Sequence, residues 1–262
     1  MGAILELQGV SMSFGGLKAV ANLSFDVQEN EIISIIGPNG SGKTTTFNVI
    51  SGLYEPESGD ILLKGESVAG LRPDQVHDKG ISRTFQSLRL FSNMSVLDNV
   101  LVGMHSITDA GLIASMLRLP SVRREEAAMR EKAQEILAMF PGRFSGPRQQ
   151  QPAYSLSYAN RRRLEIARAL ASEPALLLLD EPVAGMNPME SREVMEQIKV
   201  LRDKGYTILM IEHDMHVVEG VSDRVIAMDH GVMIAEGTYT EVANDPQVVE
   251  AYLGKRAAQA TA

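Results

Sequence analysis

Apolar and polar residues alternate near the beginning of the chain, and the pattern changes further on. Residues 4–7 and 23–27 alternate in this way, which predicts half-buried strands. The pairs Gly15-Gly16 and Glu29-Asn30 lie between such runs and predict turns. Residues 31–36 are almost all apolar, and that pattern is typical of a strand covered on both faces, as in a parallel sheet.

A helical pattern dominates the middle of the chain. A glycine-rich loop and a first helix ending at Gly52 follow the apolar strand, and residues 59–64 return to strand character. From about residue 98 to 172 the pattern is helical, with a charged amphipathic stretch over 123–140. The Pro-, Gln- and Arg-rich residues 143–152 predict a loop inside this region.

Strands and helices alternate again after this insert. The expected elements are strands over 175–179, 206–211 and 225–228 and a helix over 188–204. Asn187 is expected to cap that helix, with Pro188 at its first position and Glu190 closing a capping-box-like turn. The chain is therefore predicted to fold as one α/β unit of nucleotide-binding type, interrupted by a helical insert of roughly 70 residues.

Composition excludes several classes of protein. The chain has 262 residues, of which 44% are hydrophobic and 22% charged, so disorder and collagen-like repeats are excluded. It has no cysteine, which excludes a disulfide framework and cysteine-ligated zinc or iron–sulfur sites. The formal net charge of −8 argues against a protein that coats nucleic acid over a broad face. Because the sequence has no apolar run of membrane-spanning length and no secretory signal at its start, we expect a soluble, cytosolic protein.

A phosphate-binding motif follows the apolar strand. It fits G-x-x-x-x-G-K-[ST] and reads Gly37-Pro38-Asn39-Gly40-Ser41-Gly42-Lys43-Thr44. Its glycines let successive backbone N–H groups face the phosphates, and the N-terminus of the following helix adds partial positive charge. Lys43 is expected to reach the β- and γ-phosphates, and Thr44 to offer its hydroxyl to Mg²⁺. We expect ATP contacts from all of these residues and from Thr45.

A second buried strand ends in two carboxylates. Residues 176–179 are all leucine, and Asp180-Glu181-Pro182 follow them. Asp180 is expected near the metal and Glu181 near the γ-phosphate, where Glu181 acts as general base or orients the attacking water. Taken with the phosphate-binding motif, this pair predicts hydrolysis of Mg-ATP.

These two motifs and five others resemble those of the ATP-binding subunits of ABC transporters and occur in that family's order. The others are the adenine-stacking aromatic Phe14, the Q-loop glutamine Gln86, the signature segment Leu156-Ser157-Tyr158-Ala159-Asn160, the D-loop with Asn187 and the switch histidine His213. The resemblance implies that Gln86 and His213 act with Glu181 in catalysis, and that Gln86 ligates Mg²⁺ beside Thr44 and Asp180. It also implies that residues 157–160 contact ATP held by the opposing subunit. Taken by itself, Phe14 would instead be a core residue.

The resemblance also implies the fold. It is a single ABC ATP-binding domain over 1–262, with an α/β P-loop NTPase core at 1–97 and 173–262. The core has a mostly parallel sheet and an N-terminal antiparallel β part. A helical subdomain that carries the signature segment occupies 98–172. ATP and Mg²⁺ are the implied cofactors.

The signature segment departs from the usual Leu-Ser-Gly-Gly-Gln. Ser157 keeps the hydroxyl, and Ala159 tolerates helical geometry, so its N–H can still face phosphate. Asn160 is one methylene shorter than glutamine: either its contact is loosened, or it caps the helix over 161–170. The arginines at 161–163 are predicted to form a solvated helix face.

Within this family the chain most resembles the ATPases of branched-chain amino-acid importers. The resemblance rests on residues 14–20, 83–91, 163–168, 211–215 and 251–254, and on an insert between 111 and 124. It implies two membrane permease subunits, a second ATP-binding subunit or a copy of this chain as dimer partner, and indirectly a solute-binding protein, with no nucleic acid. The chain would lie on the cytoplasmic face of the cell membrane as a peripheral subunit. Closure on ATP would reach the permeases through the Gln86 region, where the apolar residues 87–91 form part of a groove for a permease helix.

Proteins with other functions differ from this chain in sequence features, or share its motifs. ATPases for urea, short amides or other carboxylate-bearing solutes use near-identical motifs and stay an alternative. The related lipopolysaccharide-export ATPases typically lack the insert around 110–125. A non-transport ABC ATPase acting on the ribosome or on nucleic acid would carry two cassettes or long heptads, and a P-loop kinase would lack Ser157 and Gln86. The solute leaves no mark on this chain, because ATPase subunits do not touch it.

Overall fold

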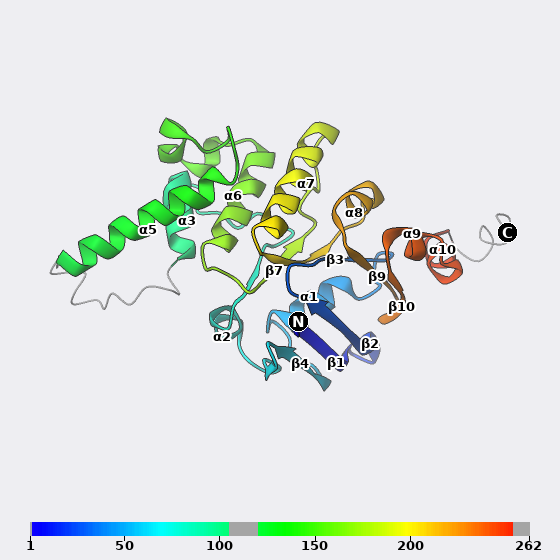
Figure 1. Ribbon diagram of the computed structural model, residues 1–262. Coiled ribbons are helices and arrows are strands. Elements are labelled where there is room, and N and C mark those ends of the chain that lie inside the picture. Colours follow the sequence, from blue (N-terminus) through cyan, green and yellow to red (C-terminus); the bar gives the residue numbers. More distant parts are fainter. Residues whose placement is uncertain (1, 105–119, 254–262) are drawn as a thin grey trace.

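The computed structural model describes residues 2–104 and 120–253, and its centre is a mostly parallel sheet (Figure 1). Within these residues the strand order is β10-β9-β3-β8-β7-β6. The strands are β3 (Ile32–Ile36), β6 (Ile81–Arg83), β7 (Leu176–Asp180), β8 (Thr207–Ile211), β9 (Arg224–Asp229) and β10 (Val232–Gly237). Neighbours pair in parallel except β10, which runs antiparallel to β9. The predicted α/β fold with a mostly parallel sheet is confirmed.

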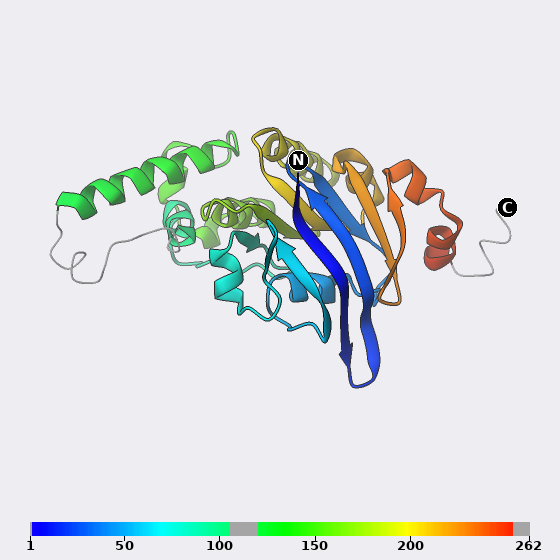
Figure 2. The same ribbon diagram turned by 60° about the horizontal axis from the view of Figure 1, so that its bottom comes forward.

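A second, antiparallel sheet has the order β2-β1-β4-β5 in the described part of the chain. Its strands are β1 (Ala3–Phe14), β2 (Leu17–Gln28), β4 (Ser58–Leu63) and β5 (Glu66–Ser67). Figure 2 shows the long β1–β2 hairpin projecting from the body of the protein. β1 and β2 are much longer than the predicted 4–7 and 23–27, because register shifts, for example between Leu7 and Val10, interrupt the alternation of apolar residues. The predicted turns at Gly15-Gly16 and Glu29-Asn30 are present.

The central strands are apolar on both faces because each face has its own cover. Ile33 of β3 belongs to the core shared with the antiparallel sheet and α1 (Lys43–Ile50). Leu177 of β7 belongs to the core shared with the helical insert and α7 (Pro188–Asp203). Figure 1 shows α1 and α7 on opposite sides of the sheet. Each fully buried side chain of this size contributes ~1.5–3 kcal/mol, so both layers stabilise the strands that carry the site.

The helical insert forms one end of the molecule in Figure 1. It contains α3 (Val96–Gly103), α5 (Pro120–Ala138) and α6 (Tyr158–Leu170), with two 3₁₀ turns, η2 (Gly146–Gln150) and η3 (Ala153–Ser155), between α5 and α6. The predicted loop at 143–152 is therefore partly helical. The insert shares one apolar core with the sheet, and α3 begins before residue 98, so the division into 98–172 and the rest stays a prediction.

Short helices complete the described elements: α2 (Pro73–Asp78), α8 (Met215–Val221), α9 (Tyr239–Ala243) and α10 (Pro246–Leu253). The hydrophobic pattern does not predict them, because a helix such as α2, with 6 residues, shows too little of its period. Residues 111–119 of the predicted insert and Gly254 lie outside the described residues. Within residues 2–104 and 120–253, no helix is both long and apolar enough to cross a membrane.

Candidate active site

The glycine-rich loop after β3 has a backbone that only glycine allows at two positions. Gly37 has φ +148° and Gly42 has φ +103°. A Cβ on Gly37 would lie 2.1 Å from the carbonyl oxygen of Met228, and a Cβ on Gly42 would lie 2.3 Å from that of Ala19. The loop is therefore wedged between β2 and β9, and its backbone leads directly into α1. Thr44 and Thr45 lie in the first turn of that helix, where backbone N–H groups have no partner within the helix.

Lys43 folds back over this loop. Its Nζ donates hydrogen bonds to the carbonyl oxygens of Gly37 at 2.7 Å and Pro38 at 2.9 Å. Burial lowers the pKa of Lys43, and the negative charge of Glu181 opposes that shift. The ammonium group thus lies between the loop and Glu181, where it can exchange loop carbonyls for phosphate oxygens.

The three predicted catalytic residues come together at the carboxyl ends of neighbouring strands. Glu181 follows β7, Gln86 follows β6 and His213 follows β8. The Nε2 of Gln86 donates to Oε2 of Glu181 at 3.4 Å, and Nδ1 of His213 lies 3.7 Å from Oε1. Each carboxylate oxygen of Glu181 therefore has its own neighbour. This is the edge of an open α/β sheet at which ligands bind.

Glu181 has an unusual backbone conformation. Its φ is +48°, in the left-handed region that residues other than glycine seldom adopt. Its N–H donates to the carbonyl oxygen of Ile211 at 3.0 Å, which holds the turn against β8. Such strain costs ~1–2 kcal/mol and is concentrated at functional sites.

Asp180 is buried, and it has a cationic partner that the sequence pattern does not predict. Arg83 at the end of β6 donates from NH2 to Oδ2 of Asp180 at 3.0 Å, and from NH1 to Oδ1 of Asn48 at 2.8 Å. The guanidinium lies over the rings of Phe47 and Phe85. Burial lowers the pKa of Arg83, and Asp180 opposes that shift. The sign of this in the sequence is that Arg83 is a single cation in a short strand, two residues before Phe85.

The predicted metal ligands offer only oxygen atoms, which suits Mg²⁺. They are the hydroxyl of Thr44, the carboxylate of Asp180 and the amide oxygen of Gln86. Arg83 occupies only Oδ2 of Asp180, and Gln86 contacts Glu181 through its Nε2, so an oxygen of each stays available. These residues therefore fit a magnesium ion.

The signature segment begins α6, and the structure rules out one of the two interpretations of Asn160. Ser157 is the N-cap, and its Oγ accepts from the backbone N–H of Asn160 at 3.4 Å. The helix begins at Tyr158, so the prediction that Asn160 caps a helix over 161–170 is wrong. Asn160 lies in the first turn, and its Oδ1 accepts from Arg163 at 3.0 Å.

The predicted solvated face at 161–163 is also wrong for two of its three arginines. Arg162 is 0% exposed and Arg163 is 1% exposed. Arg162 donates to the carbonyl oxygens of Phe85 at 2.6 Å and Gln86 at 2.8 Å, and to Oε2 of Glu165 at 3.0 Å. Charged side chains can be buried when they are paired and hydrogen-bonded, and sequence position gives no sign of such partners. In the described part of the chain, NH1 and NH2 of Arg162 have partners, whereas its buried Nε has none. Arg162 thus ties the signature helix to the segment that carries Gln86.

The D-loop lies next to the signature segment. Asn187 caps α7: its Oδ1 accepts from the N–H groups of Met189 and Glu190, each at 3.0 Å, and Glu190 completes the predicted capping box. A Cβ on Gly185 would lie 3.5 Å from the ring of Tyr158, so the two motifs approach each other. Among the described residues, Ser157 and Asn187 donate or accept within the helices that they cap and not with the phosphate-binding loop.

Phe14 lies at the end of β1, and its side chain is 43% exposed, so a place in the core is wrong. Its ring packs edge-on against that of Tyr54, with the ring centroids 5.2 Å apart. Leu17, just beyond the hairpin turn, lines one cavity together with Pro38, Asn39 and Gly40. The hairpin end is therefore close to the phosphate-binding loop, and Phe14 is an exposed aromatic residue at that end.

Comparison with known proteins gives two matching families. A profile of the family described as "ABC transporter" matches residues 20–184. A second profile, described as "Branched-chain amino acid ATP-binding cassette transporter", matches residues 232–258.

Relatives match along almost the whole chain. It is 44% identical over 253 residues to the high-affinity branched-chain amino acid transport ATP-binding protein LivG of Salmonella typhimurium, covering 96% of this chain and 98% of that protein. It is 40% identical over 258 residues to the corresponding protein BraF of Pseudomonas aeruginosa, again covering 96% and 98%. Among solved structures, the ADP conformation of MJ1267, an ATP-binding cassette of an ABC transporter, has a TM-score of 0.83 and 32% identity, covering 97% of this chain and 100% of that one.

Proposed function

This chain belongs to the ABC transporter family and is an ATP-hydrolysing cassette, and we propose that it drives the import of branched-chain amino acids. One observation carries the proposal. The chain is similar from end to end to two proteins named for branched-chain amino acid transport, at 44% and 40% identity. The match of residues 232–258 to the family with that name supports the same substrate class.

The residues at the candidate site suit hydrolysis of Mg-ATP. The backbone of residues 37–42 and the ammonium of Lys43 hold the phosphates. Thr44, Asp180 and Gln86 would hold Mg²⁺, which supplies positive charge where negative charge develops on the transferred phosphoryl group. Glu181 orients the attacking water and accepts its proton. Gln86 and His213, one beside each carboxylate oxygen, keep Glu181 in place.

We infer that a complete site needs two subunits. The phosphate-binding loop leads into α1 and would enclose phosphates on its own chain, whereas the hydroxyl of Ser157 lies at the start of α6, and no hydrogen bond between described residues joins it to that loop. That hydroxyl and the N–H groups of the first turn can serve only the ATP of an opposing subunit, which is a second copy or a second ATPase. Mg-ATP between the two subunits would then draw them together.

The surface beside Gln86 is suited to a permease helix. Phe91 and Val102 are exposed and line one groove with a cavity volume of 490 Å³, together with Arg168, whose guanidinium lies over the ring of Phe91. Arg162 connects the same Gln86 segment to the signature helix. A membrane permease subunit would bind at this groove. In a complex with two permeases and a solute-binding protein beyond them, the chain would lie at the cytoplasmic face of the membrane as a peripheral subunit.

Solute-stimulated ATP hydrolysis in proteoliposomes tests this function. The chain is reconstituted with its permeases and solute-binding protein, and ATP hydrolysis is measured with leucine, isoleucine, valine, urea or acetamide. We expect stimulation by the three amino acids alone. Stimulation by urea or acetamide would favour the alternative solute class, and hydrolysis that no solute changes would contradict a role in import.

Pull-down from membranes tests the groove separately. Phe91→Asp should lose the permeases while keeping ATP hydrolysis by the isolated subunit nearly unchanged. Val232→Asp, at an exposed position on β10, is the matched control and should retain the permeases. Retention by Phe91→Asp would remove this groove from the interface.

A further inference from the structure

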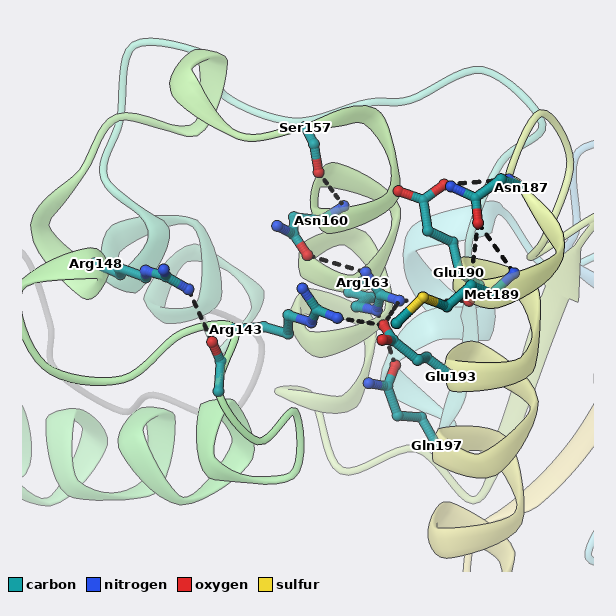
Figure 3. A network of polar contacts seen from close by, with 11 residues as sticks. Arg143, Arg148, Ser157, Asn160, Arg163, Asn187, Met189, Glu190, Glu193 and Gln197 are labelled. Carbon is teal, nitrogen blue, oxygen red and sulfur yellow. Dashed lines mark hydrogen bonds and ion pairs between the residues drawn. The ribbon is translucent and has the colours of Figure 1, made fainter.

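A buried cation, Arg163, joins the signature segment to the helix that follows the D-loop (Figure 3). Its NH1 donates to Oδ1 of Asn160 at 3.0 Å, and its NH2 donates to Oε2 of Glu193 at 2.7 Å. Its Nε donates to Oε1 of Gln197 at 3.3 Å, and NH2 also reaches the carbonyl oxygen of Glu190 at 3.4 Å. Asn160 belongs to α6, whereas the other partners all belong to α7.

Glu193 is shared between two cations. Arg143, from the segment between α5 and η2, also donates from its NH2 to Oε2 of Glu193. Burial is the main cause that lowers the pKa of Arg163; the charge of Arg143 lowers it further, and Glu193 opposes both. Glu193 is thus an acceptor that holds the guanidinium of Arg163 in place between two helices. Removing its charge would leave Arg163 buried beside another cation.

The Arg163 contact fixes the orientation of Asn160. The Oδ1 of Asn160 faces this guanidinium, and in Figure 3 its Nδ2 lies on the side away from α7, where no hydrogen bond to another described residue uses it. The backbone N–H of Asn160 donates to Oγ of Ser157. In Figure 3, Ser157, Asn160, Arg163 and Glu193 follow one another from the tip of α6 towards α7. The side chain that replaces the usual glutamine of the signature is therefore oriented by Arg163 of the same helix, and α7 holds the guanidinium of Arg163.

We propose that Arg163 and Glu193 are positioning residues that hold the signature segment in a fixed relation to α7 and, through α7, to the D-loop. This inference rests on the proposed role of residues 157–160 at the ATP of the opposing subunit. At the other end of the two motifs, the ring of Tyr158 lies close to Gly185. Two contacts therefore connect the signature segment with the D-loop and its helix: Tyr158 beside Gly185, and Arg163 between Asn160 and Glu193. The two motifs would contact the opposing nucleotide as one unit.

A matched pair of substitutions on α7 tests the proposal. Glu193→Gln keeps the shape of the side chain but removes its charge. Glu196→Gln makes the same change on the same helix at an exposed ion pair with Lys199. We expect Glu193→Gln to lower kcat of the dimeric ATPase roughly 10- to 100-fold, the range for a misplaced reacting group. ATP binding by its monomer, and both properties of Glu196→Gln, should match wild type.

Coupling to Asn160 separates positioning from a merely structural role. Asn160→Ala should lower kcat, and the Asn160→Ala/Glu193→Gln double variant should be no slower than the slower single variant, because both changes remove one connection. Arg163→Lys keeps the charge but lacks the planar fork that reaches both partners, so it should show the same loss. Thermal unfolding checks that each protein is folded at the assay temperature, and Arg163→Lys replaces Glu193→Gln in the comparison if Glu193→Gln fails to fold.

The outcomes distinguish the inference from the function on which it rests. Wild-type ATPase activity that rises only linearly with protein concentration, alone or with a second ATPase, would contradict the two-subunit site. Activity that rises more steeply, with equal kcat for Glu193→Gln and Glu196→Gln, would overturn the positioning role and leave the two-subunit site standing. Fully additive losses in the double variant would overturn it as well.

Discussion

The loop after β3 and the first turn of α6 both present groups that suit phosphate, but different parts of the chain build them. The backbone determines the shape of the loop: Gly37 and Gly42 have positive φ and lie against neighbouring carbonyl groups. Buried side chains hold α6 in position: Arg162 and Arg163 contact partners up to 77 residues away in the sequence. The loop is a local structure, whereas the signature region depends on long-range pairs.

This difference predicts how each region fails. A backbone cradle depends on the absence of side chains, so adding one methyl group should damage it. A region held by buried guanidinium groups depends on their ion pairs and hydrogen bonds, so removing one partner should leave unsatisfied charge in the core. Substitutions in the two regions can therefore be compared directly.

The largest effect should come from removing chemistry while leaving the cradle intact. Glu181→Gln keeps the phosphate-binding loop and Asp180, so Mg-ATP should bind as in wild type, while turnover falls ~10²–10⁴-fold through loss of water activation. Lys43→Ala should lose ATP affinity as well as turnover. Steady-state hydrolysis and binding of a fluorescent ATP analogue measure the two quantities. Turnover of Glu181→Gln within about threefold of wild type would exclude Glu181 as the base.

Sequence reasoning anticipated the phosphate-binding region well because its information is local. Residues 37–44 are contiguous, and an apolar strand before them and a helix after them are enough to place Lys43. The resemblance to ABC transporter subunits predicted that Gln86 and His213 act with Glu181, and the structure brings the three together at the ends of neighbouring parallel strands. Their roles in catalysis stay predictions.

The signature region was anticipated less well. A run of three arginines normally indicates a solvated face, and the acceptors that bury two of them, such as the carbonyl oxygen of Gln86 and the carboxylate of Glu193, come from other elements. The backbone conformation of Glu181 could not be predicted from the sequence either, because a left-handed φ in a residue other than glycine follows from tertiary contacts.

The second-largest effect should be on stability, in the signature region. Arg162→Met would leave the carbonyl oxygens of Phe85 and Gln86 and Oε2 of Glu165 buried without their Arg162 donor, which should cost ~3–5 kcal/mol of unfolding free energy. Arg161→Met, the neighbouring and more exposed position, should cost ~1 kcal/mol. Urea unfolding measures both. Equal losses would mean that burial of the guanidinium is not what holds this region.

Two glycines of the phosphate-binding loop test whether close approach or backbone strain requires glycine there. Gly42→Ala would place a Cβ 2.3 Å from the carbonyl oxygen of Ala19 at φ +103°, whereas Gly40→Ala meets nothing within 4 Å at φ +83°. The Gly40 variant should lose ~1–2 kcal/mol from backbone strain alone. The Gly42 variant should lose ~1–3 kcal/mol more, with weaker ATP binding, because the loop must shift. The same loss in both, measured by urea unfolding, would show that strain and not close approach requires glycine.

The smallest effect should separate the nucleotide base from the phosphates. Phe14 is exposed beside Tyr54 at the end of β1, so its removal should leave stability almost unchanged. If its ring stacks on adenine, Phe14→Ala should weaken ATP binding by ~1–3 kcal/mol, the range for base–aromatic stacking. Val200→Ala, at an equally exposed apolar residue on α7, is the control and should bind ATP normally. Inorganic triphosphate has no base to stack, so its affinity should be the same for both variants and wild type. Equal losses for ATP and triphosphate would place the effect of Phe14 in the phosphate-binding loop, and unchanged ATP affinity would remove Phe14 from the site.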